Sequence, residues 1–161
     1  MLTYQSIREL VLAAQETGQT IGRTVLADQA RLLEQTEEQL LTRMAERLTV
    51  MRAAAEQGVQ SSERSRSGLS GQSAARMQSV LEQNRTLTGP VMGKALAIAL
   101  AVAEVNARMG RIVAAPTAGS CGILPAVILT LAEAYGLADE AAVLALFTAS
   151  GIGLVIAKNA S

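Results

Sequence analysis

Two hydroxyls and a thiol lie close together in a short glycine-containing stretch, RIVAAPTAGSCGILP, at residues 111–125. The hydroxyls belong to Thr117 and Ser120, and the thiol to Cys121. An apolar run starting near Pro125 predicts a helix, so backbone N–H groups of the loop would gather at a helix N-terminus. That arrangement favours an anion such as a carboxylate. A purely structural turn, with the proline in the first turn of the helix, is the alternative.

A second candidate is the serine- and glycine-rich stretch GVQSSERSRSGLSG at residues 58–71. Its composition predicts a flexible loop or linker. A loop of this length inside a compact domain is often functional, because loops carry many binding residues. Ser67, Gly68, Ser70 and Gly71 are therefore candidates for ligand contact.

Glu104 and Asn106 lie near the end of an apolar segment, just ahead of the 111–125 stretch. A carboxylate at a helix C-terminus opposes the helix dipole and is costly to bury unless it is paired. Two interpretations stay open. Glu104 forms an ion pair with Arg108 or Arg111, or it lies behind the loop that follows and orients it.

Composition excludes several kinds of site. The chain has no histidine and one cysteine, which rules out zinc sites of the usual N/S type, Ser-His or Cys-His nucleophile pairs, and an internal disulfide. Neither Lys94 nor Lys158, the two lysines, lies in a recognisable cofactor-lysine context, so no pyridoxal phosphate is expected. A formal net charge of zero gives no case for nucleic acid or an anionic membrane surface. The lone cysteine and the lack of a signal sequence favour the cytoplasm.

The elements that must position these residues are predicted to be helices. Apolar residues make up 50% of the chain and aromatic residues 2%, which favours closely packed helices over a sheet sandwich. The fold class expected is all-α, a multi-helix domain with buried apolar central helices and a substrate-binding loop. It would be a single domain over residues 1–161, with polar helices at 1–57, the loop at 58–71 and an apolar helical core at 72–161. Helices are expected at 6–15, 20–33, 36–57, 74–87, 91–110, 126–135 and 139–157. Thr36 and Gln39 predict a capping box at the start of the third helix, and Gly18 and Gly136 are expected to end the first and the sixth.

Five segments in order resemble the alpha chain of iron–sulfur-dependent L-serine dehydratases. They are SGLSG at 67–71, LTGP at 87–90, EVNARMG at 104–110, APTAGSCGILPAV at 115–127 and FTASGIGLVIAKNAS at 147–161. The resemblance implies elimination of water from L-serine to give pyruvate and ammonia, with a [4Fe–4S] cluster as the Lewis acid for the hydroxyl. It implies a substrate site whose residues are Ser67, Gly68, Ser70, Gly71, Pro116, Thr117, Ala118, Gly119, Ser120 and Asn159, with Glu104 and Asn106 behind them. Thr117 and Ser120 would hold the substrate carboxylate.

The chain departs from the family at the cluster. A [4Fe–4S] cluster is held by cysteine thiolates, and the resemblance places the family's cluster cysteines beyond Ser161. No metal ligand is therefore expected in this chain, and Cys121 is interpreted as a small buried hydrophobe. The expected partners are L-serine, the C-terminal half of the alpha chain and a beta chain or domain, in an oligomer. Two alternatives are a non-catalytic helical assembly module and a small membrane protein. The membrane alternative is disfavoured, so no contact with a membrane is expected.

Overall fold

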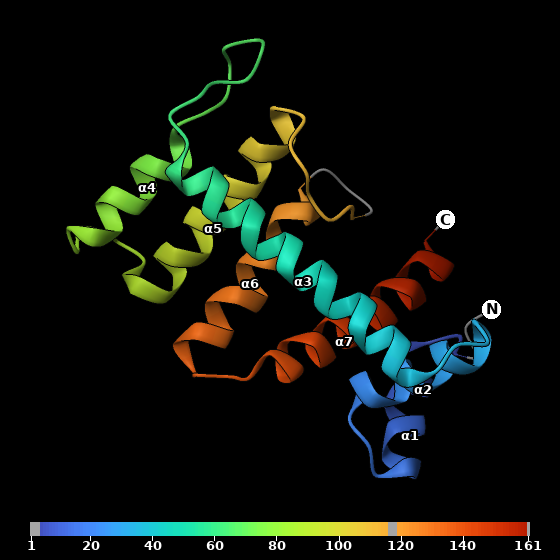
Figure 1. Ribbon diagram of the computed structural model, residues 1–161. Helices are drawn as coiled ribbons and strands as arrows, with labels where there is room; N and C mark the ends of the chain where they lie inside the picture. Colours follow the sequence, from blue (N-terminus) through green and yellow to red (C-terminus); the bar gives the residue numbers. More distant parts are fainter. Residues whose placement is uncertain (1–3, 116–118, 161) are drawn as a thin grey trace. The chain divides into compact units, whose positions relative to one another are not determined.

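The computed structural model describes residues 4–115 and 119–160. The regular secondary structure of these residues is helical. Within these ranges it contains seven α-helices and no strand, which confirms the all-α prediction. The helices are α1 (Ile7–Thr17), α2 (Ile21–Leu32), α3 (Glu37–Gln60), α4 (Ser73–Glu82), α5 (Gly89–Ala107), α6 (Ser120–Ala134) and α7 (Asp139–Asn159) (Figure 1).

The chain forms two compact units. Unit 1 comprises residues 1–45 and 139–161, and unit 2 comprises residues 46–138. Helix α3 begins in unit 1 and ends in unit 2. The single domain over residues 1–161 stays a prediction.

Unit 1 is built from α1, α2, α7 and the start of α3, and its helix ends follow local sequence signals. Ser6 and Thr20 cap α1 and α2 through their side-chain oxygens. At the start of α3, Thr36 and Gln39 hydrogen-bond each other's backbone N–H groups at 3.2 and 3.0 Å. This is the capping box that the sequence predicts. Helix α2 packs on α7, with Val25 fully buried.

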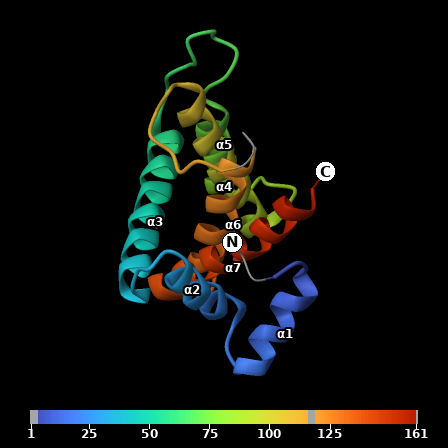
Figure 2. The same cartoon turned by 90° about the vertical axis from the view of Figure 1, so that its right-hand side faces the viewer.

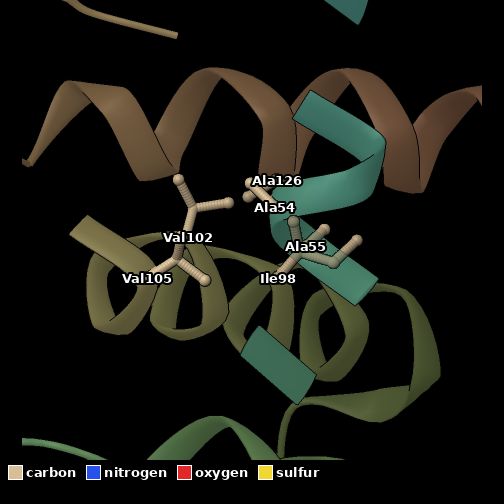
Figure 3. Packing of buried hydrophobic residues seen from close by; sticks show 6 residues of the cluster. All are labelled: Ala54, Ala55, Ile98, Val102, Val105 and Ala126. Atoms are coloured by element: carbon tan, nitrogen blue, oxygen red, sulfur yellow. The ribbon is translucent and has the colours of Figure 1, made fainter. Parts of the chain in front are cut away.

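Unit 2 contains the rest of α3 together with α4, α5 and α6. Helix α5 packs against both α4 and α6. Figure 3 shows the core, where small and β-branched side chains of α3, α5 and α6 meet. Its buried members are Ala54, Ala55, Ile98, Val102, Val105 and Ala126. Such small side chains allow the helix backbones to approach closely.

Gly58 lies inside α3, so the loop that composition predicts from residue 58 begins only after Gln60. A Cβ at this position would lie 2.3 Å from the carbonyl oxygen of Ala101 on α5. The tight packing of two helix backbones therefore outweighs the poor helix propensity of glycine.

Gly58→Ala is expected to destabilise unit 2 by about 1–3 kcal/mol, because the added methyl group forces α3 and α5 apart. Gly153→Ala is the matched control, since Gly153 is also inside a helix but has open space where the Cβ would stand. That variant should be neutral or more stable by about 0.5–1 kcal/mol. Urea denaturation of both variants measures the difference, and equal stabilities would contradict the packing argument.

Helix α6 corrects a second prediction. It begins at Ser120, not near Leu124–Pro125, and Pro125 lies inside it. Proline removes one backbone donor and crowds the carbonyl four residues earlier, but Pro125 is fully buried, and Gly122 packs against the backbone of Ala99. The packing of this turn offsets the lost hydrogen bond. The sequence signal for a helix start was therefore misleading.

Two further expectations are modified. Helix α4 ends at Glu82, earlier than predicted, and Asn84 just beyond it adopts a left-handed φ of 53°. Helix α5 is not buried all round, because Met92, Leu96 and Leu100 are exposed. By length and composition alone, α5 and α7 could each cross a membrane, but core helices of soluble proteins pass the same test. Absence of membrane contact stays a prediction.

Candidate functional site

Both candidate loops lie at the same end of unit 2. The segment 61–72 connects α3 to α4, and the segment 108–119 connects α5 to α6. Figures 1 and 2 show the first of these loops projecting beyond the helix ends, with the second emerging beside it from the end of α5. The N-termini of α4 and α6 thus lie at this end of unit 2, and helix N-termini favour anions.

The 61–72 loop is closed by its own hydrogen bonds. The N–H of Ser65 donates to the carbonyl of Ser70 at 2.8 Å, and the N–H of Gly68 donates to the carbonyl of Ser65 at 2.8 Å. The N–H of Ser70 in turn donates to the Ser65 hydroxyl at 3.2 Å. The segment is therefore a compact hydrogen-bonded turn, not the open linker that its composition predicts.

The two glycines of this turn have different surroundings. Gly71 adopts a φ of 130°, and a Cβ there would lie 2.5 Å from the carbonyl oxygen of Glu63 and 2.8 Å from the Cα of Arg64. Glycine is thus needed at this position for the loop to close. Gly68 has a φ of 72°, but open space surrounds it. Of the two, Gly68 leaves room for a ligand beside the backbone.

The two candidate hydroxyls of the loop also differ. The Ser67 hydroxyl lies 3.1 Å from that of Ser65 and accepts a hydrogen bond from the N–H of Leu69 at 3.4 Å. The Ser70 hydroxyl is exposed and makes no hydrogen bond within the described part of the chain. Ser70 therefore offers a free donor to a ligand, whereas Ser67 already holds the turn together.

A small hollow adjoins the base of this loop. Its volume is about 320 Å³, and it is lined by Gln60, Ser61, Ser62, Gln72, Ala75, Arg76 and Ser79. A larger pocket of about 470 Å³ lies elsewhere in unit 2 and is lined by residues of α3, α5 and α6 together with Gln78 and Leu137. Of the sequence-predicted site residues that the structure describes, none lines the larger pocket.

Glu104 is 5% exposed and contacts the end of the 61–72 loop. Its Oε1 atom accepts hydrogen bonds from the N–H groups of Ser73 at 2.7 Å and Ala74 at 3.4 Å. It therefore caps α4, whose own N-cap residue, Gln72, provides no side-chain cap. Within the described residues Glu104 forms no ion pair with Arg108, so the orienting interpretation fits better. The loop it contacts is nevertheless 61–72, not the one that follows α5.

For Arg108, at the end of α5, the sequence suggests only an ion pair with Glu104. Its Nη1 atom instead donates to the Ser61 hydroxyl and to the carbonyl of Glu63, the latter at 3.4 Å. The sequence feature that links Arg108 to this site is its position four residues after Glu104, on the same face of the helix. Asn106, between them in sequence, is exposed.

The second loop is described only in part. Pro116, Thr117 and Ala118 lie outside the described residues, so their predicted contacts with a carboxylate stay predictions. Gly119 is the N-cap residue of α6 and has no side chain with which to cap the helix. Ser120 is the first helical residue. Cys121 is buried in the same turn, as expected for a small hydrophobe.

Asn159 belongs to unit 1, at the end of α7. Its Nδ2 atom donates to the carbonyls of Gln5 and Val155, both at 2.8 Å. These bonds tie the first described residues to α7. The amide therefore has a structural use within unit 1, and its predicted contact with substrate stays a prediction.

The residues of this chain do not fit a [4Fe–4S] cluster. Such a cluster needs several thiolates, whereas the chain has one cysteine, and that cysteine is buried within α6. Over residues 4–115 and 119–160, no group of three or more histidine, cysteine, aspartate or glutamate side chains is placed to hold a metal ion. Ser161 lies outside the described residues, and the location of the cluster cysteines beyond Ser161 stays a prediction.

Comparison with known proteins connects these two loops to one family. The family model described as "Serine dehydratase alpha chain" matches residues 7–161. The chain is 34% identical to "Probable L-serine dehydratase, alpha chain" from Bacillus subtilis (strain 168), over 98% of this chain and 52% of the relative. It is 33% identical to "L-serine dehydratase, alpha chain" from Peptoniphilus asaccharolyticus, over 96% of this chain and 53% of the relative.

A longer relative, "L-serine dehydratase 2" from Escherichia coli (strain K12), is 35% identical over 98% of this chain and 35% of its own length. No solved structure was found to match the chain. The chain spans about half the length of the curated alpha chains that it matches. Since the family model covers both loops and all seven described helices, the chain belongs to the serine dehydratase alpha-chain family.

Proposed function

We propose that this chain supplies the substrate-binding side of an L-serine dehydratase, which eliminates water from L-serine to give pyruvate and ammonia. The observation that carries the proposal is the extent of the family match, which includes both loops at one end of unit 2. Serine dehydratase is the activity in the names of the relatives. The elimination removes the Cα proton and the Cβ hydroxyl, and the resulting enamine tautomerises and hydrolyses.

The chain's own contribution would be to hold the substrate. A carboxylate needs fixed donors, and the N-terminus of α6 at Gly119 and Ser120 supplies backbone N–H groups and a favourable dipole. Thr117, with Pro116 and Ala118, would complete that cradle. The exposed Ser70 hydroxyl is a further donor from the 61–72 loop. The α-ammonium and hydroxyl of serine would lie toward the reacting groups.

The [4Fe–4S] cluster of such an enzyme would be held by other polypeptide, because this chain has a single thiol. When bound, the cluster supplies a Lewis acid for the departing hydroxyl. The proposed partners are therefore further alpha-chain sequence with the cluster cysteines and a beta chain or domain, assembled in the cytoplasm as an oligomer.

Exposed apolar stripes in unit 2 support such an assembly. Met92, Leu96 and Leu100 recur every four residues on α5, and Ile123, Val127 and Leu131 do the same on α6. Residues four apart share one face of a helix, and exposed apolar faces of this kind mark interaction surfaces. The same stripes support the alternative of a non-catalytic assembly module, in which the chain would bind partners but not serine.

Binding of L-serine separates these two functions. We expect saturating L-serine to slow amide hydrogen exchange over residues 61–72 and at the start of α6, with no change in α1 or α2. Ethanolamine, which is serine without its carboxylate, is the matched control and should protect neither segment. Unchanged exchange at all amides in the presence of L-serine would favour the assembly module.

A further inference from the structure

The 61–72 loop is held at both ends by two residues four positions apart, Glu104 in the last turn of α5 and Arg108, the C-cap residue of that helix. Arg108 donates to the Ser61 hydroxyl and the Glu63 carbonyl at the start of the loop. Glu104 accepts from the N–H groups of Ser73 and Ala74, directly after its end. Residues four apart lie on one face of a helix, so a single stretch of α5 fixes both ends of the turn.

A third contact closes the base of the same loop. The Nε2 atom of Gln72 donates to the carbonyl of Ser62 at 2.7 Å. The hydrogen bonds within 65–70 then shape the tip, which carries the free Ser70 hydroxyl. The position of that hydroxyl is therefore set by the base of the loop, and the base is set by α5.

Stabilisation of α5 alone does not explain why Glu104 and Arg108 contact the loop instead of each other. The second carboxylate oxygen of Glu104, Oε2, and the second guanidinium nitrogen of Arg108, Nη2, are both buried without a hydrogen-bond partner in the described part of the chain. Buried polar atoms with unused hydrogen-bonding capacity cost free energy. An ordinary surface ion pair between Glu104 and Arg108 would avoid that cost but would release both ends of the loop.

We propose that Glu104 and Arg108 are positioning residues for substrate binding: they clamp the 61–72 loop so that its tip presents Ser70 to the carboxylate of L-serine. This inference rests on the proposed dehydratase function. The residues act through the backbone of the loop and do not touch the substrate. Loss of either one lowers the fraction of molecules with a preformed loop and so weakens apparent affinity for the substrate.

The variants Glu104→Ala and Arg108→Ala test the clamp. Arg64 and Arg66 are exposed in the loop and provide trypsin sites, and cleavage there reports local opening. Both variants should be cleaved after these residues about 10-fold faster than the parent protein. Glu104→Gln keeps an oxygen that accepts from Ser73 and should be cleaved at nearly the parent rate. Arg111→Ala, which removes an exposed arginine of the neighbouring segment, is the control for Arg108→Ala.

Steady-state kinetics of the assembled enzyme test the consequence for substrate. We expect KM for L-serine to rise about 10-fold in Glu104→Ala and Arg108→Ala with kcat within about 3-fold, because uniform binding is lost. Glu104→Gln should restore KM. Circular dichroism and thermal melting of each variant confirm that its helices remain folded.

Three results would overturn the inference. Parent-like cleavage of both alanine variants would show that the clamp does not hold the loop. Fast cleavage with unchanged KM would show that the loop's position does not matter for serine. Failure of Glu104→Gln to restore KM despite parent-like cleavage would show that the carboxylate itself meets the substrate. If the parent enzyme turns over no serine, the dehydratase proposal fails, while proteolysis still decides whether the clamp exists.

Discussion

Ser70→Ala is expected to lower kcat/KM for L-serine by about 10–100-fold, because it removes a hydrogen bond to a charged group worth about 1.5–3 kcal/mol. The folded structure should be unaffected, since the Ser70 hydroxyl bonds to none of the described residues and only its backbone closes the turn. The measurement is steady-state pyruvate release by the assembled enzyme, with the melting temperature of each variant as a check on folding.

Ser67→Ala is the informative comparison. The Ser67 hydroxyl contacts Ser65 and Leu69 within the turn, so its removal loosens the loop before it affects any ligand. It should increase tryptic cleavage after Arg64 and Arg66, which Ser70→Ala should not. If Ser70→Ala leaves kcat/KM unchanged, the loop does not contact the carboxylate.

Gly71→Ala is expected to have the second large effect, because two independent constraints act at this position. Its φ of 130° is strained for any residue with a Cβ, and that Cβ would overlap the backbone at Glu63 and Arg64. The 61–72 loop would have to open, which should raise KM for L-serine by at least about 10-fold through loss of the preformed loop.

Gly68→Ala separates the two constraints. Gly68 also has a positive φ, but apart from its chain neighbours no heavy atom of the described residues lies within 4 Å of its Cβ position. Strain alone should cost about 1 kcal/mol there, with a KM change of several-fold at most. Equal effects of the two variants would mean that the close approach at Gly71 is not what closes the loop.

Local signals in the sequence predicted most helix ends correctly. The Thr36–Gln39 capping box and the left-handed glycines at Gly18 and Gly136 each depend on residues a few positions apart. The start of α6 and the end of α3 could not be predicted in this way. Both depend on contacts with α5, at Ala99 and Ala101, that are visible only in three dimensions.

In the candidate site, too, local sequence features could be predicted, whereas contacts between distant segments could not. Composition and the family resemblance identified Ser67, Ser70 and the glycines of the loop, but not which hydroxyl is free. For Glu104 the sequence leaves an ion pair and an orienting role open, and its partner Ser73, 31 residues away in sequence, is not predicted. Spacing along one helix predicts which residues share a face, whereas the loop that they hold depends on how α4 packs against α5.

Pyruvate release from L-serine tests the central claim, that this chain forms the substrate side of a dehydratase, most directly. The chain would be co-expressed with the proposed cluster-bearing alpha-chain segment and beta chain, and assayed anaerobically beside each component alone. We expect pyruvate from the complete assembly and none from the 161-residue chain by itself, since it has one thiol for a cluster that needs several. Pyruvate release by the isolated chain, or none from a folded, cluster-loaded assembly, would contradict the claim.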